Sequence, residues 1–359
     1  MYIRRQEGKP WGTHETKVGH GRFDRTFYVL GPLLLRSALL DAETRRLLLK
    51  LNAECSFELA YGELRADMVD EKIPDLLPLL LDLGQRIIQP WDVAQRLAEN
   101  AQKDPETEVR LGNLLLLARE FPGEPGTTGA LRTACADGSL QIRLQAAKKL
   151  GAEGREVLAE LAASPLNDDV SAEAVSFLGG DLPIERARTI LVQALSRRHV
   201  RTACAGLKTL GGSTAAEDIE TLAAVMAREK GELAVAAAAA LGTTGSPAVE
   251  RPLLLAMQHE EKDLRLAAAK ALGRVGTEAA VMPLKEAAEG SLPYTSFRRA
   301  ARQAVAEIQS RLPGASPGQL SLTEDEAGRL SLASDLAGQL SLPADEPGQL
   351  SFSGGGENL

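Results

Sequence analysis

The stretch LRLAAAKALG at residues 264–273 recurs, with changes, along most of the chain. Each copy has an apolar residue near its start, small residues in the middle and Leu-Gly at its end. The clearest further copies are IRLQAAKKLG (142–151), VSAEAVSFLG (170–179) and LAVAAAAALG (233–242), and TACAGLKTLG (202–211) is weaker. Apolar residues three and four positions apart indicate an amphipathic helix, and the glycine indicates its end. The stretch therefore predicts one helix that is repeated.

The last apolar residue of the motif is an anchor from which the repeat can be measured. Two stretches at 109–118 and 297–306 match without the glycine, and neighbouring anchors are 28 to 33 residues apart. That spacing leaves room for two helices of about 11–13 residues with short turns. It predicts an all-α fold, an α-solenoid of about seven helical hairpins over residues 105–312. The anchors are Leu117, Leu150, Leu178, Leu210, Leu241, Leu272 and Val305.

Two further positions of the motif predict how the hairpins stack. Small residues four positions before the anchor let neighbouring helices approach closely, and the glycine after the anchor is expected to cap the helix in the left-handed region. The first position holds Asn113, Ala146, Ala174, Gly206, Ala237, Ala268 and Ala301. The expected caps are Gly151, Gly179, Gly211, Gly242 and Gly273.

The repeated motif resembles HEAT-type repeats of bacterial proteins, especially the short variety called PBS-lyase-like HEAT repeats. The whole chain is also similar to HEAT-repeat proteins predicted from bacterial genomes. The resemblance implies an α-solenoid over about residues 105–312. It leaves the function open, because such repeats occur in scaffolds, lyases, a hydroxylase and DNA-repair enzymes.

Three other segments flank the solenoid. Residues 1–72 predict a small α+β unit, incomplete at its N-terminus, with a strand at 26–31, a helix at 33–51 and a hairpin turn at Tyr61-Gly62. Residues 73–104 predict a connector of helices broken by Pro74, Pro78 and Pro90. Residues 313–359 are rich in Pro, Gly, Ser and acidic residues, which predicts a disordered tail.

Charge and cysteine content narrow the class of protein. Most of the net charge of −8 comes from the tail, so the folded parts are nearly neutral and bulk attraction to nucleic acid is not indicated. The three scattered cysteines, Cys55, Cys135 and Cys204, predict buried thiols in a reducing compartment. The polar N-terminus and the interrupted apolar run at 73–88 predict neither a secretion signal nor a membrane span. We therefore expect a soluble cytoplasmic protein.

No residue constellation for catalysis or cofactor binding stands out. The His-Glu pairs at 14–15 and 259–260 invite comparison with di-iron hydroxylases that have HEAT repeats, but one pair within the solenoid cannot hold two irons. Phosphate-binding glycine loops and zinc spacings are absent, and His199 lies off the helical face of Cys204. We expect no catalytic residue, metal or cofactor, and keep a lyase- or hydroxylase-type enzyme as an alternative.

Basic residues recur at two positions of the motif. Arginines seven positions before the anchor are expected to pair between neighbouring repeats, although a ligand-binding ladder is the alternative. Lysines two positions before the anchor are expected to form a broken stripe on the concave face, our best candidate for a binding surface, although a solvated helix face is the alternative. The pairing set is Arg110, Arg143, Arg265 and Arg298, with Asp263 next to Arg265. The binding set is Lys148, Lys208 and Lys270, with Arg302 nearby.

The tail contains a second repeat with a period of ten residues. Gly-Gln/Arg-Leu-Ser-Leu/Phe occurs four times, beginning at Gly318, Gly328, Gly338 and Gly348. Three interpretations remain open: a duplicated linker, four docking motifs that act together, or segments that pair with one another or with a sheet edge. The apolar motif residues are Leu320, Leu322, Leu330, Leu332, Leu340, Leu342, Leu350 and Phe352.

These observations favour a non-enzymatic scaffold or adaptor that binds a protein partner on the solenoid face. The alternatives are the modification enzyme and a nucleic-acid-binding protein that uses the concave lysines. Both tryptophans lie outside the repeats, and the repeat region is nearly neutral, so the nucleic-acid alternative is the weaker one.

Overall fold

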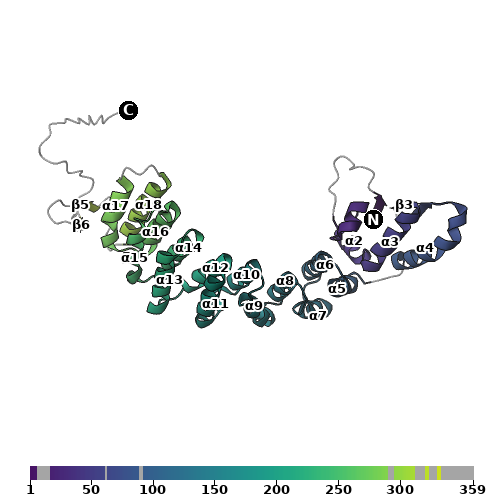
Figure 1. The fold of residues 1–359 in the computed structure, drawn as a ribbon, viewed down its shortest axis with the longest axis horizontal. Coiled ribbons are helices and arrows are strands. Elements are labelled where there is room, and N and C mark those ends of the chain that lie inside the picture. Colours follow the sequence, from purple (N-terminus) through teal and green to yellow (C-terminus); the bar gives the residue numbers. More distant parts are fainter. Residues whose placement is uncertain are drawn as a thin grey trace, which may run out of the picture.

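The chain forms a small N-terminal α+β unit followed by a curved array of paired helices (Figure 1). This arrangement confirms the predicted all-α solenoid with its N-terminal α+β region. The computed structural model describes residues 1–5, 17–60, 63–88, 92–289, 295–311, 320–322 and 330–332. None of the helices in these ranges is long and apolar enough to cross a membrane.

The N-terminal unit contains a four-stranded antiparallel sheet in the order β2-β1-β3-β4. Ile3 on the central strand lies opposite Val29 on one side and Leu59 on the other, and all three side chains are buried. Leu48 of α3 and Leu83 of α4 belong to the same buried cluster. The elements are β1 (Tyr2–Arg5), α1 (Gly21–Thr26), β2 (Phe27–Leu30), α2 (Leu33–Leu39), α3 (Ala42–Glu54), β3 (Ser56–Ala60), β4 (Glu63–Asp67) and α4 (Ile73–Ile88).

Two sequence-based predictions for this unit were wrong in detail. The helix expected at 33–51 is divided into α2 and α3, because the Asp41 carboxylate accepts a hydrogen bond from the Thr44 N–H and starts a new helix. Pro78 does not break a helix, because α4 continues through it as one helix of 16 residues. Pro90 and the turn at Tyr61-Gly62 lie outside the described residues.

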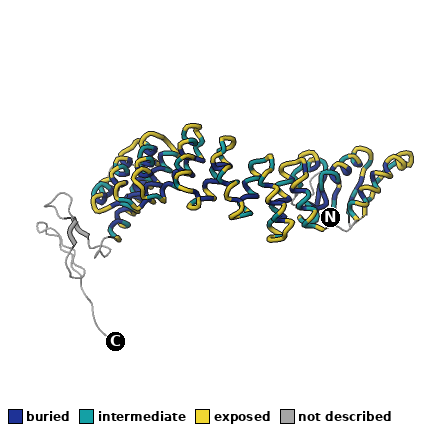
Figure 2. Tube along the Cα trace, turned by 90° about the horizontal axis from the view of Figure 1, so that it is seen from below, coloured by how far each residue is buried: buried dark blue, intermediate teal, exposed yellow. Residues whose placement is uncertain are grey.

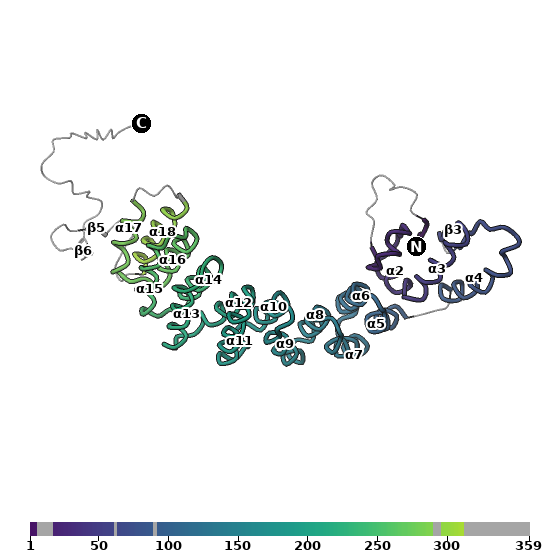
Figure 3. The backbone as a smooth tube through the Cα atoms, viewed as in Figure 1, coloured from purple at the N-terminus to yellow at the C-terminus, as the bar shows by residue number. Residues whose placement is uncertain are grey.

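Within the described ranges, seven helical hairpins form the solenoid. Each pairs an outer helix with an inner helix, named by their positions on the arc in Figure 3. The pairs are α5 (Val93–Lys103) with α6 (Thr107–Glu120), α7 (Pro125–Ala134) with α8 (Leu140–Leu150), α9 (Arg155–Ala162) with α10 (Asp168–Leu178), α11 (Ile184–Arg197) with α12 (Val200–Leu210), α13 (Ala216–Arg228) with α14 (Glu232–Leu241), α15 (Glu250–Ala256) with α16 (Lys262–Val275), and α17 (Val281–Glu289) with α18 (Thr295–Arg311).

A buried seam runs between the inner and outer helices along the array (Figure 2). Every predicted anchor except Leu150 is buried in it. No hairpin could bury its apolar face alone, so each depends on its neighbours. The first hairpin starts at Val93 rather than near residue 105, since α5, expected in the connector, packs against α6.

The glycines after the anchors have two different roles. Gly151 and Gly179 have positive φ angles of 61° and 49°, which favour glycine, but their ψ angles of −116° and −122° lie outside the left-handed helical region that was predicted. The prediction was wrong for Gly211 and Gly242, which have φ angles of −60° and −68°, and for Gly273, which lies inside α16.

Close packing explains these last three glycines. A Cβ atom added to Gly242 would lie 2.7 Å from the Cα of Ala271 in the next hairpin. A Cβ atom added to Gly211 or Gly273 would lie within 3.1 Å of backbone atoms of Ala240 or Ala304, respectively. These alanines each precede an anchor. Gly therefore faces Ala from one inner helix to the next across the last four hairpins.

A buried ion pair joins the N-terminal unit to the solenoid. The two terminal guanidinium nitrogens of Arg45 on α3 each lie 2.9 Å from a carboxylate oxygen of Asp104, which follows α5. The side chains are only 2% and 1% exposed. Asn100 of α5 also donates from Nδ2 to the carbonyl of Ser37 at 3.0 Å. These contacts attach the first hairpin to α2 and α3.

Candidate functional site

The inner helices α6, α8, α10, α12, α14, α16 and α18 line the concave side of the arc (Figure 3). All four residues of the predicted binding set lie on these helices. Lys148 lies on α8, Lys208 on α12, Lys270 on α16 and Arg302 on α18. The four side chains therefore belong to the inner helices of four different hairpins.

Lys148 differs from the other three cations. Its Nζ lies 2.6 Å from Glu173 Oε1 on α10 and 5.3 Å from the centre of the Phe177 ring. These contacts use its charge to hold two neighbouring hairpins together. Lys208, Lys270 and Arg302 are exposed and make no ion pair or side-chain hydrogen bond with the described residues. They are the cations that remain for a partner.

A cavity of about 390 Å³ lies between α14 and α16 beside Lys270. Its α14 side is apolar because this helix, ELAVAAAAAL, contributes only small side chains such as Val235 and Ala239. Leu266 and Ala267 of α16 complete its apolar part. The charged lining residues are Lys270, Arg274 and Asp263. The cavity therefore combines an apolar floor with two cations and one carboxylate.

Most of the predicted pairing arginines contact the following hairpin. Arg110 makes two hydrogen bonds to Asp137, at 2.9 and 3.0 Å, across the first two hairpins. Arg143 reaches Glu160 at 3.1 Å, and the guanidinium of Arg265 lies 5.7 Å from the centre of the Phe297 ring.

Two members of that set behave differently. Arg298 donates to the carbonyl of Ala288 in its own hairpin, at 2.8 Å. Asp263 makes no side-chain ion pair with the described residues and lines the inner cavity instead. The set is therefore a mixture of links between hairpins, a link within one hairpin and a residue of the concave surface.

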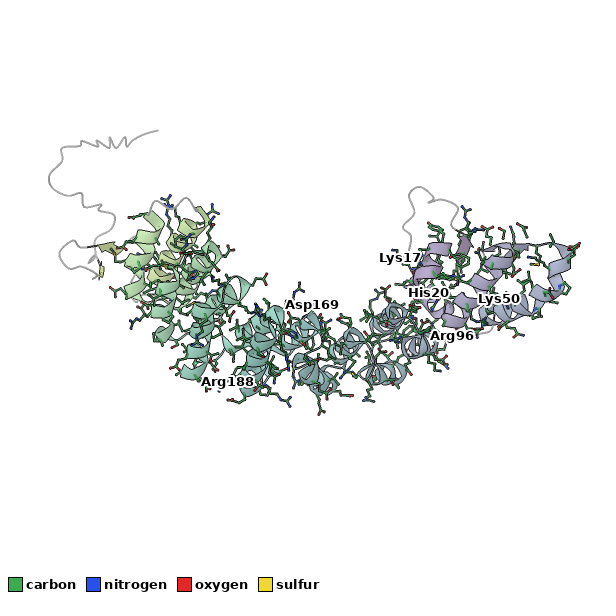
Figure 4. The ribbon with its side chains drawn as sticks, viewed as in Figure 1. Lys17, His20, Lys50, Arg96, Asp169 and Arg188 are labelled. Carbon is green, nitrogen blue, oxygen red and sulfur yellow. The ribbon has the colours of Figure 1, made fainter. Side chains whose placement is uncertain are left out.

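A second set of ion pairs, which the sequence did not reveal, links an outer helix of one hairpin to the next hairpin. Arg132 pairs with Glu153 at 2.8 Å and Arg155 pairs with Asp181 at 2.8 Å, and both pairs are exposed. Arg188 of α11 lies on the outer side of the arc (Figure 4) and contacts the buried Asp218 of α13 at 2.5 Å. The three arginines occupy different positions in their helices, so no periodic pattern marks them.

Asp218 gives the solenoid an expected pH dependence. Its hydrogen bonds from Arg188 lower its pKa, and the hydrogen bond from Ser213 acts in the same direction against the effect of burial. Because the folded-state pKa is depressed, this stabilisation is present above the unfolded value of about 3.9 and is lost as the pH falls through the folded value. Asp218→Asn should therefore destabilise the protein at about pH 7 and less at a pH below about 3.9.

Urea unfolding at the two pH values tests this expectation. The matched control is Asp169→Asn, which alters an ion pair with Arg201 whose side chains are 67% and 69% exposed, and should have little effect at either pH. A destabilisation by Asp218→Asn that stays constant between the two pH values would contradict the assignment.

The described residues do not form a metal site. No group of three or more His, Cys, Asp or Glu side chains in these ranges is placed to hold a metal ion. His20 starts α1 by accepting from the Phe23 N–H, and His259 accepts from the Glu261 N–H. His14 lies outside the described residues.

The cysteines are free and partly buried rather than fully buried as predicted. Burial raises the pKa of Cys55, Cys135 and Cys204, which disfavours the reactive thiolate.

An exposed apolar stripe lies on α4, outside the solenoid. Ile73, Leu77, Leu81 and Ile88 are 42%, 48%, 58% and 79% exposed and lie along one side of the helix. Gly84, in the same row, has open space above it. Exposed apolar rows of this kind mark interaction surfaces. The sequence had shown this run only as too short and interrupted for a membrane span.

Two copies of the tail motif pair with each other. β5 (Leu320–Leu322) and β6 (Leu330–Leu332) are antiparallel, with Ser321 opposite Ser331. Of the three interpretations of the tail, this register agrees with segments that pair among themselves. Leu340, Leu342, Leu350 and Phe352 lie outside the described residues, and so does most of the predicted disorder.

Comparison with known proteins agrees with this geometry. The family model described as HEAT repeats matches residues 219–306. One similar structure is that of an engineered protein, with 17% identity, TM-score 0.36, and coverage of 51% of this chain and 96% of that one. Another is human deoxyhypusine hydroxylase in complex with glycerol, with 21% identity, TM-score 0.25, and coverage of 60% and 85%.

At these TM-scores the two structural likenesses add nothing to the family match. A search of curated proteins found no match. The match at 219–306 covers the hairpins in which the motif and its spacing are most regular. The chain therefore contains HEAT repeats, which the family model matches over residues 219–306.

Proposed function

We propose that the protein is a non-enzymatic scaffold that binds a protein partner on the concave side of its last four hairpins. The observation that carries the proposal is the cavity with an apolar floor between α14 and α16, with Lys208, Lys270 and Arg302 exposed on the same series of inner helices. HEAT repeats commonly bind proteins, and solenoids use their concave surfaces for this purpose. The extended array supplies the area that a protein interface needs.

The chemistry of this surface indicates the kind of segment that it would bind. Small side chains on α14 leave room for the aliphatic side chains of a partner, and the cations beside them favour carboxylates. We therefore expect an acidic segment with leucine- or valine-sized anchors. A nucleic acid would fit less well, because Asp263 lines the cavity and no aromatic side chain does.

Charge reversal on the concave side is expected to abolish partner binding. The triple variant Lys208→Glu, Lys270→Glu, Arg302→Glu should lower partner recovery by at least about tenfold, since it places like charges opposite an acidic segment. The measurement is quantitative affinity purification of the full chain from its source cells. Addition of nuclease to one arm shows whether nucleic acid mediates the recovery.

A control with the same charge change separates this surface from the rest of the molecule. Arg186, Arg228 and Arg251 are exposed on the outer helices α11, α13 and α15. Replacing all three with Glu changes the net charge by the same amount as the concave triple variant, but on the outer side. This control should keep full recovery. Equal loss of recovery in both triple variants would contradict the assignment to the concave surface. So would a loss that occurs only in a third variant, Leu77→Asp, Leu81→Asp, on the apolar stripe of α4.

A further inference from the structure

A second cavity, of about 420 Å³, lies where the N-terminal unit meets the first two hairpins. Residues from the segment before α1, from α2, from α6 and from α8 line it. Lys17 marks its position in Figure 4, on the side of the N-terminal unit that faces the hairpins. It lies away from the α14–α16 cavity, so it is independent of the proposed partner surface. Its volume suits a small molecule.

The charged residues that line this cavity are all basic. They are Lys17, Arg36, Arg119 and Lys149, and each comes from a different segment. No Asp or Glu is among the lining residues that the structure describes. Arg119 uses Nε in an ion pair with Glu120 at 2.6 Å, so its terminal nitrogens remain for a ligand. Four cations that converge on one small space favour a ligand with at least two negative charges.

Arg36 shows that the positive charge extends into the protein interior. It is only 5% exposed, and burial lowers its pKa. A guanidinium stays charged at neutral pH even when its pKa falls somewhat. In a partly enclosed site, a fixed positive charge attracts an anion more strongly than a solvated surface lysine does.

Asn113 gives the cavity a buried polar group as well. The side chain is 4% exposed, and its Nδ2 donates to the Val109 carbonyl at 2.8 Å. Because a carbonyl accepts only from the amide nitrogen, this bond fixes the orientation of the amide. Its Oδ1 is buried and has no hydrogen-bond partner among the described residues. Buried acceptors are normally satisfied, so a donor from a ligand is expected here.

The sequence repeat makes Asn113 an exception. The same position, four before the anchor, holds alanine or glycine in the six later hairpins. Helix packing at that position therefore needs only a small residue, and the asparagine must be explained otherwise. It occurs in the one hairpin whose inner helix borders both α2 and this cavity. Leu33, Leu115 and Leu116 provide an apolar wall beside it.

We propose that this cavity binds a small dianion that also carries a hydroxyl or N–H donor. The anionic groups would contact Lys17, Arg36, Arg119 and Lys149, and the donor would bond to Asn113 Oδ1. Phosphate monoesters and hydroxydicarboxylates share this chemistry. The pairs malate with succinate, and glycerol 3-phosphate with methyl phosphate, serve as probes, since only the first member of each pair carries the hydroxyl.

Isothermal titration of the full chain with these four probes tests the proposal. We expect saturable binding of malate or glycerol 3-phosphate, with the preferred member identifying the carboxylate or phosphate class. Arg119→Glu, Lys149→Glu changes two exposed cations that the fold does not need, and should weaken binding by at least about tenfold. Lys270→Glu, Arg302→Glu is the control and should leave binding unchanged.

Asn113→Ala tests the hydrogen-bond donor separately. It introduces the residue found at most of the equivalent positions and so should preserve folding, which circular dichroism would check. It should remove the preference for malate over succinate, or for glycerol 3-phosphate over methyl phosphate, while charge-driven binding remains. No saturable binding at millimolar concentrations, or affinities that neither variant alters, would overturn the proposal whatever the fate of the partner surface.

Discussion

Replacing Asp104 with alanine is expected to lower the free energy of unfolding by about 3–5 kcal/mol. The substitution leaves the Arg45 guanidinium, which is 2% exposed, buried without the carboxylate that it contacts through two hydrogen bonds. Because the stability of a solenoid is approximately a sum of local contributions, we expect the loss of stability to be confined to the junction between the N-terminal unit and the first hairpin. Urea unfolding with hydrogen exchange should show faster exchange in α3 and α5 and little change in α16.

Two further variants make this prediction specific. Asp181→Ala breaks an ion pair with Arg155 whose side chains are 58% and 59% exposed, and should cost no more than about 1 kcal/mol. Arg45→Met, Asp104→Leu replaces both charges with apolar groups and should recover much of the stability lost by Asp104→Ala. If Asp104→Ala and Asp181→Ala have equal effects, the buried pair does not hold the N-terminal unit to the solenoid.

Replacing Gly242 with alanine is expected to cost about 1–3 kcal/mol through overpacking. Its φ of −68° suits alanine, so backbone strain is not the reason. The new Cβ would instead lie 2.7 Å from the Cα of Ala271, and the next hairpin would have to move away. Gly129→Ala, inside α7 with open space around the added atom, should stabilise the protein by about 0.5–1 kcal/mol.

Thermal unfolding of both variants distinguishes packing from capping. Under the packing account the melting temperature falls for Gly242→Ala and rises for Gly129→Ala. A rise for both would mean that the Gly-Ala contacts between inner helices do not limit the approach of the hairpins.

The solenoid could be predicted because its period depends on local chemistry. The anchors from Leu117 to Val305 repeat every 28 to 33 residues, and that spacing alone requires paired helices. The packing role of Gly211, Gly242 and Gly273 could not be predicted in the same way. It depends on the alanine that the next inner helix brings against each of them, whereas a Cβ atom at Gly151 would meet nothing within 4 Å.

The candidate sites, like the fold, could be predicted only where they depend on local sequence. The spacing of Lys208 and Lys270 within the motif indicated second helices, but it could not show that Glu173 neutralises Lys148 from another hairpin. The cavity at the junction could not be predicted from the sequence for a similar reason. It needs α2, α6 and α8 side by side, and only the tertiary structure brings Arg36, Asn113 and Lys149 together.

Site-specific photo-crosslinking tests the proposed concave surface most directly. A photoreactive residue at Ala239, in the cavity floor, is compared with one at Val192 on α11 and one at Leu81 on α4, which are 63% and 58% exposed. We expect Ala239 to crosslink to an acidic segment of one partner protein and the other two positions not to do so. Crosslinks to that partner from Val192 or Leu81, with none from Ala239, would contradict it.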